Sequence, residues 1–450
     1  MRIHFIAIGG SAMHNLAIAL HKKGFEVTGS DDMIFEPSAG RLARFGILPA
    51  AMGWHEEAIT PDLDAVILGM HALLDNPELL RAQALGLKIY SYPEYIYEQT
   101  KNKLRVVIGG SHGKTTITSM ILHVLNFHGK DFDYLVGAQL EGFDTMVKVT
   151  DAAPLIIIEG DEYLASPIDR RPKFHLYKAN IAVISGVAWD HVNVFPTFES
   201  YLHQFELFID TIQPNGKLIY CEADKELRKI VNNNHSEVGK IGYEIPAHRL
   251  EGGVTYLQPG NLPLKFFGDH NLMNLSAAKL VCREIGISEE DFNSAITSFK
   301  GAAKRLELLF EDKNTNVYKD FAHSPSKLKA TIEAVKSQFE ERKLVACIEL
   351  HTFSSLNKNF LLQYADTMIQ ADNSIVYIDE KTFQQKKIMP FNEIDVRTAF
   401  NNDKLTFFDN ANTLEQYLRG LDFKDTNLLL MSSGNFGGMD LVTLARELNN

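Results

Sequence analysis

The amino-acid sequence predicts an α/β protein in which parallel strands alternate with helices. Short apolar runs alternate with helical patterns along most of the chain. Three of these runs, Ile3–Ile8, Arg105–Ile108 and Leu428–Met431, end in a Gly- or Ser-rich turn. The chain has 450 residues, which corresponds to about two to four domains.

Two helical patterns follow directly on the first two runs, at Ala12–Lys23 and Thr115–His128, so each pair forms a strand–turn–helix unit. Further apolar runs predict strands at Glu26–Gly29, Ala65–Leu68, Leu155–Ile158, Ile181–Ile184, Lys217–Tyr220, Leu344–Ile348 and Ser374–Ile378. Val238–Leu264 is weakly patterned and indicates no clear element.

Two polar stretches are the predicted domain boundaries. The charged segment Glu98–Lys103 precedes the second strand–turn–helix unit, and the basic segment Lys300–Arg305 follows a helical stretch that ends near Phe299. We therefore expect three α/β domains, at residues 1–103, 104–303 and 304–450.

The composition excludes several functional classes. There are 45 Lys and Arg against 57 Asp and Glu, and the net charge of −12 argues against a general binder of nucleic acid or anionic membranes. The N-terminal run enters a glycine turn as a first strand does, and no window approaches the roughly 20 apolar residues of a membrane span. The three cysteines form no CxxC pair, which suits a reducing compartment, so we expect a cytoplasmic protein.

The strongest local motif is a phosphate-binding loop between a strand and a helix. It reads Gly110-Ser111-His112-Gly113-Lys114-Thr115-Thr116. Glycines let backbone N–H groups surround phosphate oxygens, and the helix N-terminus adds its dipole. Lys114 would neutralise the terminal phosphates, and Thr115 or Thr116 would hold Mg²⁺. The loop is a short variant, because only two residues separate Gly110 from Gly113.

Carboxylates at the end of a strand make a magnesium site plausible beside this loop. Glu159, Asp161 and Glu162 follow the run Leu155–Ile158, and Asp190-His191 closes another turn. Mg²⁺ prefers oxygen ligands, and a neutral His191 could bind a metal or the γ-phosphate. Together with the loop, these residues predict a site for ATP and Mg²⁺.

The N-terminal turn is a weaker signal. Gly9-Gly10-Ser11 opens a helix, and Asp31 ends the second strand, as in a dinucleotide fingerprint that lacks its first glycine because Ala7 stands there. The residues alone leave open a nicotinamide or flavin cofactor, another diphosphate such as a UDP-sugar, or a turn without a ligand.

The order of these motifs resembles the Mur ligase family of ATP-dependent amide-forming enzymes over essentially the whole chain. The later motifs that carry the resemblance are Gly268-Asp269-His270-Asn271-Leu272-Met273-Asn274, Lys304-Arg305-Leu306-Glu307, Asp320-Phe321-Ala322-His323 and Met431-Ser432-Ser433-Gly434-Asn435-Phe436-Gly437-Gly438. The resemblance implies a three-domain architecture, with a Rossmann-like N-terminal domain, a P-loop ATPase-like central domain and a Rossmann-like C-terminal domain. It also implies UDP-N-acetylmuramate as a substrate and an acyl phosphate intermediate, with the protein a monomer or homodimer.

The resemblance assigns residues to each substrate. UDP-sugar contacts are expected at Gly9, Gly10, Ser11, Ala12, Met13, Ser30, Asp31 and His71. ATP contacts are expected in the loop Gly110–Thr116 and at His270, Asn271, Asn274, Arg305 and Asp320. Metal ligands are expected at Thr115, Glu159 and His191, and catalytic groups at Lys114, Glu159, His191 and His323. Contacts with a peptide substrate are expected at His351, Ser433, Gly434, Asn435 and Phe436.

Two branches of the family begin with such a glycine turn, and they differ in the amine substrate. One joins L-alanine to UDP-N-acetylmuramate in biosynthesis. The other joins the peptide L-Ala-γ-D-Glu-meso-diaminopimelate in recycling. The peptide-adding branch is the expectation, because it is favoured by the segments Asp161–Tyr163 with Ile168–Phe174, Arg305–Leu308 and Met431–Gly438.

Some residues depart from the family pattern. Gly186 stands where an Asn is usual, Ser324 where a second His is usual, and an Arg is missing beside Thr352, which puts the amine site in doubt. These departures leave a non-catalytic nucleotide-binding protein as one alternative. An oxidoreductase with a nicotinamide is another, although the second phosphate loop argues against it.

Overall fold

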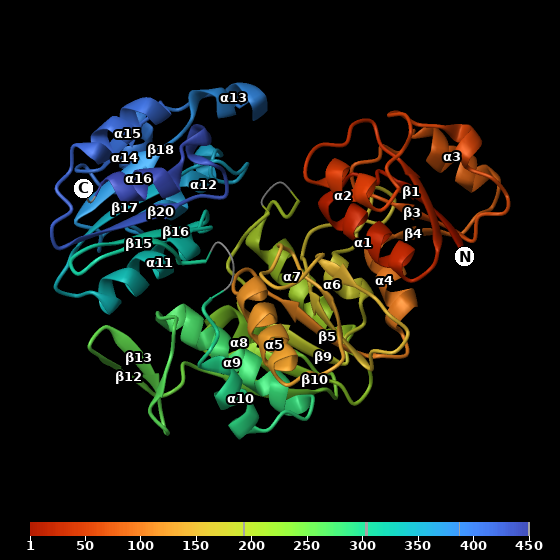
Figure 1. Ribbon diagram of the computed structural model, residues 1–450, viewed down its shortest axis with the longest axis horizontal. Coiled ribbons are helices and arrows are strands. Elements are labelled where there is room, and N and C mark those ends of the chain that lie inside the picture. The colour runs from red at the N-terminus through yellow and green to blue at the C-terminus, as the bar shows by residue number, and fades with distance from the viewer. Residues whose placement is uncertain (192–193, 302–304, 387, 449–450) are drawn as a thin grey trace. The chain divides into compact units, whose positions relative to one another are not determined.

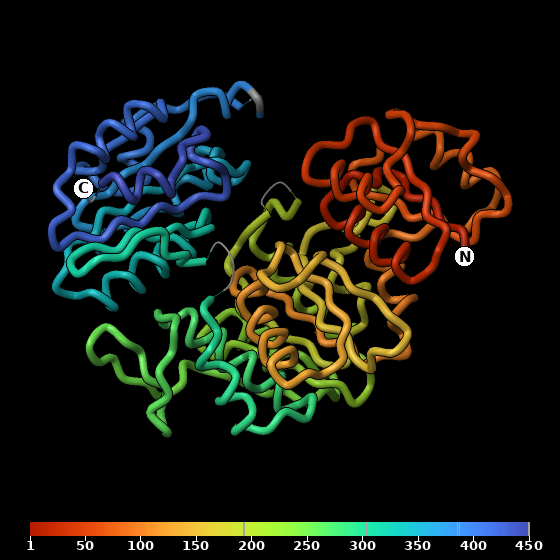
Figure 2. The backbone as a smooth tube through the Cα atoms, viewed as in Figure 1, coloured from red at the N-terminus to blue at the C-terminus, as the bar shows by residue number. Residues whose placement is uncertain are grey.

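The computed structural model describes residues 1–191, 194–301, 305–386 and 388–448. They form two compact units. Figures 1 and 2 show the chain as a ribbon and as a tube. Unit 1 consists of residues 1–187, 197–244 and 277–292, and unit 2 of the described residues in 188–196, 245–276 and 293–450. Helices α9 (Asp269–Glu284) and α10 (Glu289–Ile296) contain residues of both units.

The N-terminal part of unit 1 is a four-stranded parallel sheet in the order β2-β1-β3-β4. Its strands are β1 (Arg2–Ile6), β2 (Glu26–Ser30), β3 (Ala65–Leu68) and β4 (Ile89–Ser91). The accompanying helices are α1 (Ser11–Lys22), α2 (Ser38–Arg44), η1 (Glu56–Ala58), α3 (Pro77–Ala84) and α4 (Tyr92–Thr100). Helix α4 begins at a capping box of Ser91 and Glu94, which satisfies the first backbone donors of the helix.

The second sheet of unit 1 has seven strands in the order β11-β10-β9-β5-β8-β6-β7, and only β7 is antiparallel to its neighbour. Its strands are β5 (Leu104–Gly109), β6 (Asp133–Leu135), β7 (Val147–Lys148), β8 (Leu155–Glu159), β9 (Ile181–Ile184), β10 (Lys217–Cys221) and β11 (Gly239–Tyr243). The helices are α5 (Lys114–Phe127), α6 (Lys173–Leu176), α7 (Phe198–Asp210) and α8 (Lys225–Asn233). Strand β5 lies between β8 and β9, so the carboxyl ends of these three strands meet at one edge.

Unit 2 contains a six-stranded sheet in the order β15-β16-β20-β17-β18-β19, with β15 antiparallel. Its strands are β15 (Glu307–Glu311), β16 (Asn316–Asp320), β17 (Lys343–Glu349), β18 (Asn373–Tyr377), β19 (Thr406–Phe408) and β20 (Thr426–Met431). A small antiparallel sheet is formed by β12 (His248–Glu251), β13 (Val254–Leu257) and β14 (Leu262–Pro263). The helices are α11 (Pro325–Gln338), α12 (Lys358–Leu361), η2 (Leu362–Tyr364), α13 (Glu380–Lys386), α14 (Glu393–Phe400), α15 (Ala411–Arg419), η3 (Phe436–Gly438) and α16 (Leu441–Glu447).

Both faces of the six-stranded sheet are buried, because alternate residues of each strand point to opposite sides. On β17, Ala346 and Ile348 belong to one core, which Leu328 of α11 also joins. Cys347, between them, belongs to the opposite core, together with Leu444 of α16. This is the sandwich of helices around a parallel sheet that the sequence predicts.

The predicted strands and the two predicted helices all occur, with bounds that shift by about one or two residues. The sequence analysis missed the strands β11 to β14, which lie in the weakly patterned segment, and also the strands β4, β6, β7, β15, β16 and β19. The boundary expected at 303/304, with Lys304, lies outside the described residues. Within the described part of the chain, no helix is long and apolar enough to cross a membrane.

Candidate active site

The phosphate loop runs from the end of β5 to the first residue of α5. Gly113 is the N-cap of α5 with φ 78°, and Gly110 has φ 122°. A Cβ at Gly110 would overlap Ser185, which follows β9. Both glycines are therefore required by the backbone, since L-residues rarely adopt this region. The loop leads directly into α5, and the binding of a phosphate at the N-terminus of this helix remains a prediction.

Lys114 points back over this loop. Its Nζ donates to the carbonyl oxygen of Gly110 at 2.6 Å and forms an ion pair with Glu162 Oε2, also at 2.6 Å. The hydroxyl of Tyr201, on α7, donates to Glu162 Oε1 at 3.3 Å. Burial is the largest single influence and lowers the pKa of Lys114, but the charges of Glu162, Asp161 and Glu159 together with the hydrogen bond to Glu162 outweigh it, and the net pKa is raised. Lys114 is therefore a fully charged group held inside the loop.

Thr115 and Glu159 meet beside the loop. Thr115 Oγ1 donates to Glu159 Oε1 at 2.7 Å, and the backbone N–H of Gly137 donates to Glu159 Oε2 at 2.8 Å. Glu159 ends β8, next to β5, which explains how residues distant in sequence come together. A hydroxyl and a carboxylate are oxygen donors suited to Mg²⁺, so these two residues fit the predicted ion.

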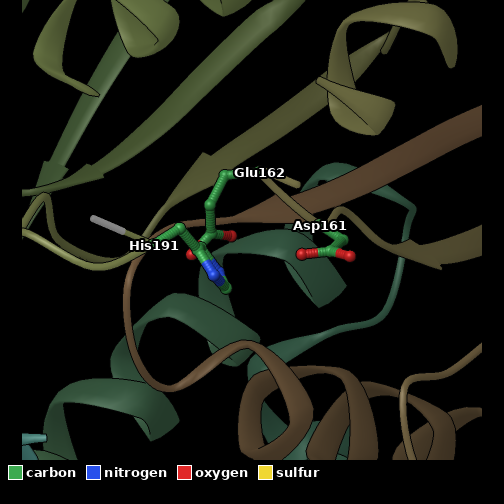
Figure 3. A group of neighbouring side chains, drawn as sticks. All are labelled: Asp161, Glu162 and His191. Atoms are coloured by element: carbon green, nitrogen blue, oxygen red, sulfur yellow. The ribbon is translucent and has the colours of Figure 1, made fainter. Parts of the chain in front are cut away.

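The neighbouring carboxylates have separate partners. Asp161 Oδ2 pairs with Lys173 Nζ at 2.6 Å and thereby closes the segment between β8 and α6. Figure 3 shows Asp161 and Glu162 projecting from the chain after β8. His191, also drawn there, belongs to unit 2, and its role as a metal ligand remains a prediction.

Gly186, which stands where the family usually has an asparagine, lies directly against the phosphate loop. Gly186 has φ 153°, and a Cβ at this position would overlap the ring of His112. The carbonyl oxygen of Gly186 accepts the N–H of Ser111 at 2.9 Å, and Ser111 Oγ lies 2.8 Å from His112 Nδ1. An asparagine at this position would require the ring of His112 to shift.

The N-terminal turn is held by Asp31. Its Oδ2 accepts the N–H of Gly9 at 2.7 Å, while Gly10 is the N-cap of α1 and Ser11 is exposed at the start of that helix. Burial, followed by the neighbouring Asp32, raises the pKa of Asp31 to about 6. Asp31 therefore stabilises the turn, and a contact between this carboxylate and a ribose remains a prediction.

The other expected UDP-sugar residues differ in exposure. Ser30 and Met13 are buried, Ala12 is partly buried, and His71 is exposed. The hydroxyl of Ser30 lies 3.4 Å from Nε2 of the buried His4. The accessible part of this turn is thus Gly9 to Ala12, at the N-terminus of α1.

The expected adenine contacts lie at the start of α9. Asn271 donates from its side chain to the Phe267 carbonyl oxygen at 2.8 Å, and Asn274 is buried. Burial lowers the pKa of His270, and of the nearby charges Asp320 raises it and Arg305 lowers it further. His270, Asp320 and Arg305 are therefore grouped within unit 2.

Asp320 and His323 form hydrogen bonds with the backbone of neighbouring residues in unit 2. Asp320 accepts the N–H groups of Leu306 and Ala322, both at 2.7 Å. His323 Nδ1 lies 2.8 Å from the Phe321 carbonyl oxygen, and burial, then Lys327, lowers the pKa of His323 to about 3. A group with this pKa is a weak proton acceptor at neutral pH, so positioning suits His323 better than general-base catalysis.

The turn after β20 is organised by Glu349 at the end of β17. Glu349 Oε2 accepts the N–H of Phe436 at 2.9 Å and the hydroxyl of Ser432. The ring of Phe436 is buried and stacked on Tyr377, and a contact between Phe436 and a peptide remains a prediction. The side chain of Phe436 packs in the hydrophobic core on one face of the six-stranded sheet.

The remaining expected peptide contacts are more open. His351, Ser433 and Gly434 are partly buried, and Asn435 is exposed. At the missing arginine, Thr352 forms a local turn in which its N–H donates to Ser355 Oγ at 3.0 Å. Ser324 is the N-cap of α11.

Sequence reasoning overlooked the ion pair of Lys114 with Glu162 and the hydrogen bond from the Tyr201 hydroxyl to Glu162. It also overlooked Glu349 as the residue that holds the turn after β20. The signal for Glu349 was a charged residue at the end of an apolar strand, because such positions lie at the ligand-binding edge of parallel sheets.

A phosphate loop on a parallel sheet, with Lys114 in the loop and Thr115 beside a strand-end carboxylate, defines a nucleotide-dependent enzyme of the P-loop type. The model of the Mur ligase catalytic domain matches residues 2–103, and that of the Mur ligase middle domain matches residues 108–282. The chain belongs to the Mur ligase family, whose members are ATP-dependent ligases that form C–N bonds.

A curated relative from Caldicellulosiruptor bescii is named UDP-N-acetylmuramate–L-alanine ligase. It is 31% identical over 387 residues, which cover 83% of this chain and 82% of the relative. A solved ligase of the same name from Thermotoga maritima has a TM-score of 0.68 and 21% identity, and covers 100% of this chain and 98% of its own. A murein peptide ligase from Psychrobacter arcticus has a TM-score of 0.65 and 22% identity, and covers 100% and 99%.

These comparisons confirm the three-domain Mur ligase fold with parallel sheets. They contradict the expected peptide-adding branch, because further curated relatives at 28–30% identity are also named UDP-N-acetylmuramate–L-alanine ligase. The expectation depended on short segments such as Met431–Gly438, and the structure uses part of that segment for packing.

Proposed function

We propose that the protein is an ATP-dependent ligase that joins the carboxylate of UDP-N-acetylmuramate to the amino group of L-alanine. The observation that carries the proposal is the loop geometry, with Lys114 inside the loop and Thr115 bonded to Glu159. The choice of L-alanine is supported by the names of curated relatives that match over most of their length.

The proposed chemistry is that of the Mur ligase family, and the charged groups of unit 1 would serve it as follows. The substrate carboxylate attacks the γ-phosphate of ATP, and ADP leaves as an acyl phosphate forms. Lys114 and the N-terminus of α5 would hold the phosphates, while Thr115 and Glu159 would hold Mg²⁺, which supplies electrostatic stabilisation of the transferred group. The amine then attacks the acyl carbon and phosphate leaves, which gives the amide.

We assign the remaining substrates to the other predicted domains. Residues 1–103 would bind the UDP-sugar through Gly9 to Ala12, and residues 304–450 would bind the amine near His351 and Ser433. His270, Asn271 and Asn274 would bind the adenine side, and His191 would complete the metal site. A cytoplasmic location is part of the proposal, because ATP and a UDP-sugar are both cytoplasmic metabolites.

The test is phosphate release from ATP by the purified full chain with Mg²⁺ and UDP-N-acetylmuramate, with and without L-alanine. We expect release that depends on both substrates, and mass spectrometry should show the UDP-N-acetylmuramoyl-L-alanine product. A parallel reaction contains L-Ala-γ-D-Glu-meso-diaminopimelate. Turnover with that tripeptide and none with L-alanine would overturn the assignment of the amine. K114A, which lacks the loop cation, is the inactive control.

A further inference from the structure

Lys114 of the phosphate loop forms a buried ion pair with Glu162. The side chains of Lys114 and Glu162 are 17% and 1% exposed, and their ion pair is 2.6 Å long. Tyr201 is fully buried and donates its hydroxyl to the second carboxylate oxygen of Glu162. The cation that the terminal phosphates of ATP require is therefore already bound to a carboxylate.

A second buried ion pair, at the opposite edge of the same sheet, provides a comparison for the pair of Lys114 and Glu162. Lys103, directly before β5, pairs with Asp133, the first residue of β6, at 2.6 Å. Asp133 also accepts the N–H and hydroxyl of Thr150, so backbone and side-chain partners from the fold itself complete the pair. The Lys114 pair lies instead inside the loop that faces the ligand.

We propose that Glu162 is a positioning residue that acts as an exchangeable counter-ion for Lys114 and thereby weakens the binding of ATP. This inference rests on the proposed ATP site. A buried, unpaired ammonium group is costly, so the free loop needs a carboxylate partner. When the β- and γ-phosphates of ATP pair with Lys114, the ion pair between Lys114 and Glu162 is broken or weakened. The free energy of the lost ion pair makes the binding free energy of ATP less favourable.

The decisive variant is Glu162→Gln, which keeps the shape of the side chain and the acceptor for Tyr201 but removes the charge. We expect E162Q to bind ATP at least about threefold more tightly than the wild type, because free Lys114 has lost its competing anion. Isothermal titration calorimetry in EDTA measures the Kd without any contribution from Mg²⁺. AMP lacks the phosphates that contact Lys114, so its Kd should not change.

The same exchange predicts an effect on stability. E162Q should have a lower thermal midpoint than the wild type without ligand, and ATP should raise this midpoint more in E162Q. The matched control is Asp133→Asn, which breaks the buried pair at the opposite edge. D133N should lower the midpoint but leave the Kd for ATP within about twofold of the wild type.

Tyr201→Phe gives a second test that does not remove the ion pair. In Y201F, Glu162 has lost the hydroxyl that donates to its carboxylate, so the carboxylate is less well stabilised when Lys114 pairs with ATP instead. Y201F should therefore bind ATP about two- to threefold more weakly than the wild type. Unchanged or weaker ATP binding by E162Q would overturn the inference, and if E162Q does not fold, an unchanged Kd in Y201F would do so. A wild type that binds no ATP would instead refute the proposed function itself.

Discussion

Arg105 connects three segments of unit 1 through their backbone. It is the second residue of β5, and only 3% of it is exposed. Its Nε and Nη1 atoms donate at 2.9–3.1 Å to the carbonyl oxygens of Tyr177, Lys178, Thr100, Lys101 and Lys103. Thr100 is the last residue of α4, so the guanidinium group also lies at the negative end of the helix dipole.

Arg105→Met should therefore destabilise unit 1 without touching the candidate active site. Methionine keeps the apolar stem but has no donor. The carbonyls of Thr100 and Tyr177 are buried, whereas the bonds to the other three carbonyls are partly exposed and water can replace them. A buried carbonyl without a donor costs about 1–3 kcal/mol, so two of them give about 2–6 kcal/mol.

Urea unfolding followed by circular dichroism measures this loss of unfolding free energy. Arg171→Met is the matched control, because Arg171 is 60% exposed and its ion pair with Asp169 is at the surface. We expect a change of less than about 1 kcal/mol in R171M. A loss below about 1 kcal/mol in R105M, or one equal to that in R171M, would refute the argument that buried carbonyls depend on Arg105.

Three further predictions concern the sites. Thr115→Val should reduce the affinity for Mg²⁺ by at least about tenfold, measured by the Mg²⁺ dependence of turnover, while ATP binding in EDTA remains. Between about pH 4 and pH 6, folded Asp31 keeps a proton that the unfolded chain loses, so this group stabilises the fold less as pH rises. Asp31→Asn removes this titration. The unfolding free energy of D31N minus that of the wild type should therefore increase from about pH 4 to about pH 6, as measured by unfolding at a series of pH values. Glu349→Ala leaves the N–H of Phe436 without its acceptor, so the KM for L-alanine should rise several-fold while the KM for ATP changes little.

Much of the fold could be predicted because its strands are buried on both faces. The runs that form β3 and β9 consist entirely of buried apolar residues, and they match the predicted bounds. Strand β12 is different, since His248–Glu251 is mostly exposed and lies in a small antiparallel sheet. Such a strand has no continuous apolar run, and its pairing with β13 is a tertiary property that local pattern does not reveal.

The candidate site was predictable where spacing along the chain determines it. Gly113, Lys114 and Thr115 are consecutive, and the strand before them fixes their place. The ion pair with Glu162 joins residues 48 positions apart, and it depends on β8 lying beside β5. Exposure was also unpredictable from sequence, as Phe436 shows: a short glycine-rich motif does not reveal which side chain turns into the core.

The positions of the two buried lysines explain why their ion pairs differ in consequence. At the amino ends of the strands, Lys103 and Asp133 tie one connection to the sheet, and the fold supplies all their partners. At the carboxyl ends, loops leave the sheet and backbone N–H groups point outward, so an anion from solution can compete there for the same cation. A lysine at that edge needs a partner in the free protein and must also be able to exchange it. Glu162 meets both requirements, because Tyr201 remains as a donor to its carboxylate when Lys114 turns to phosphate.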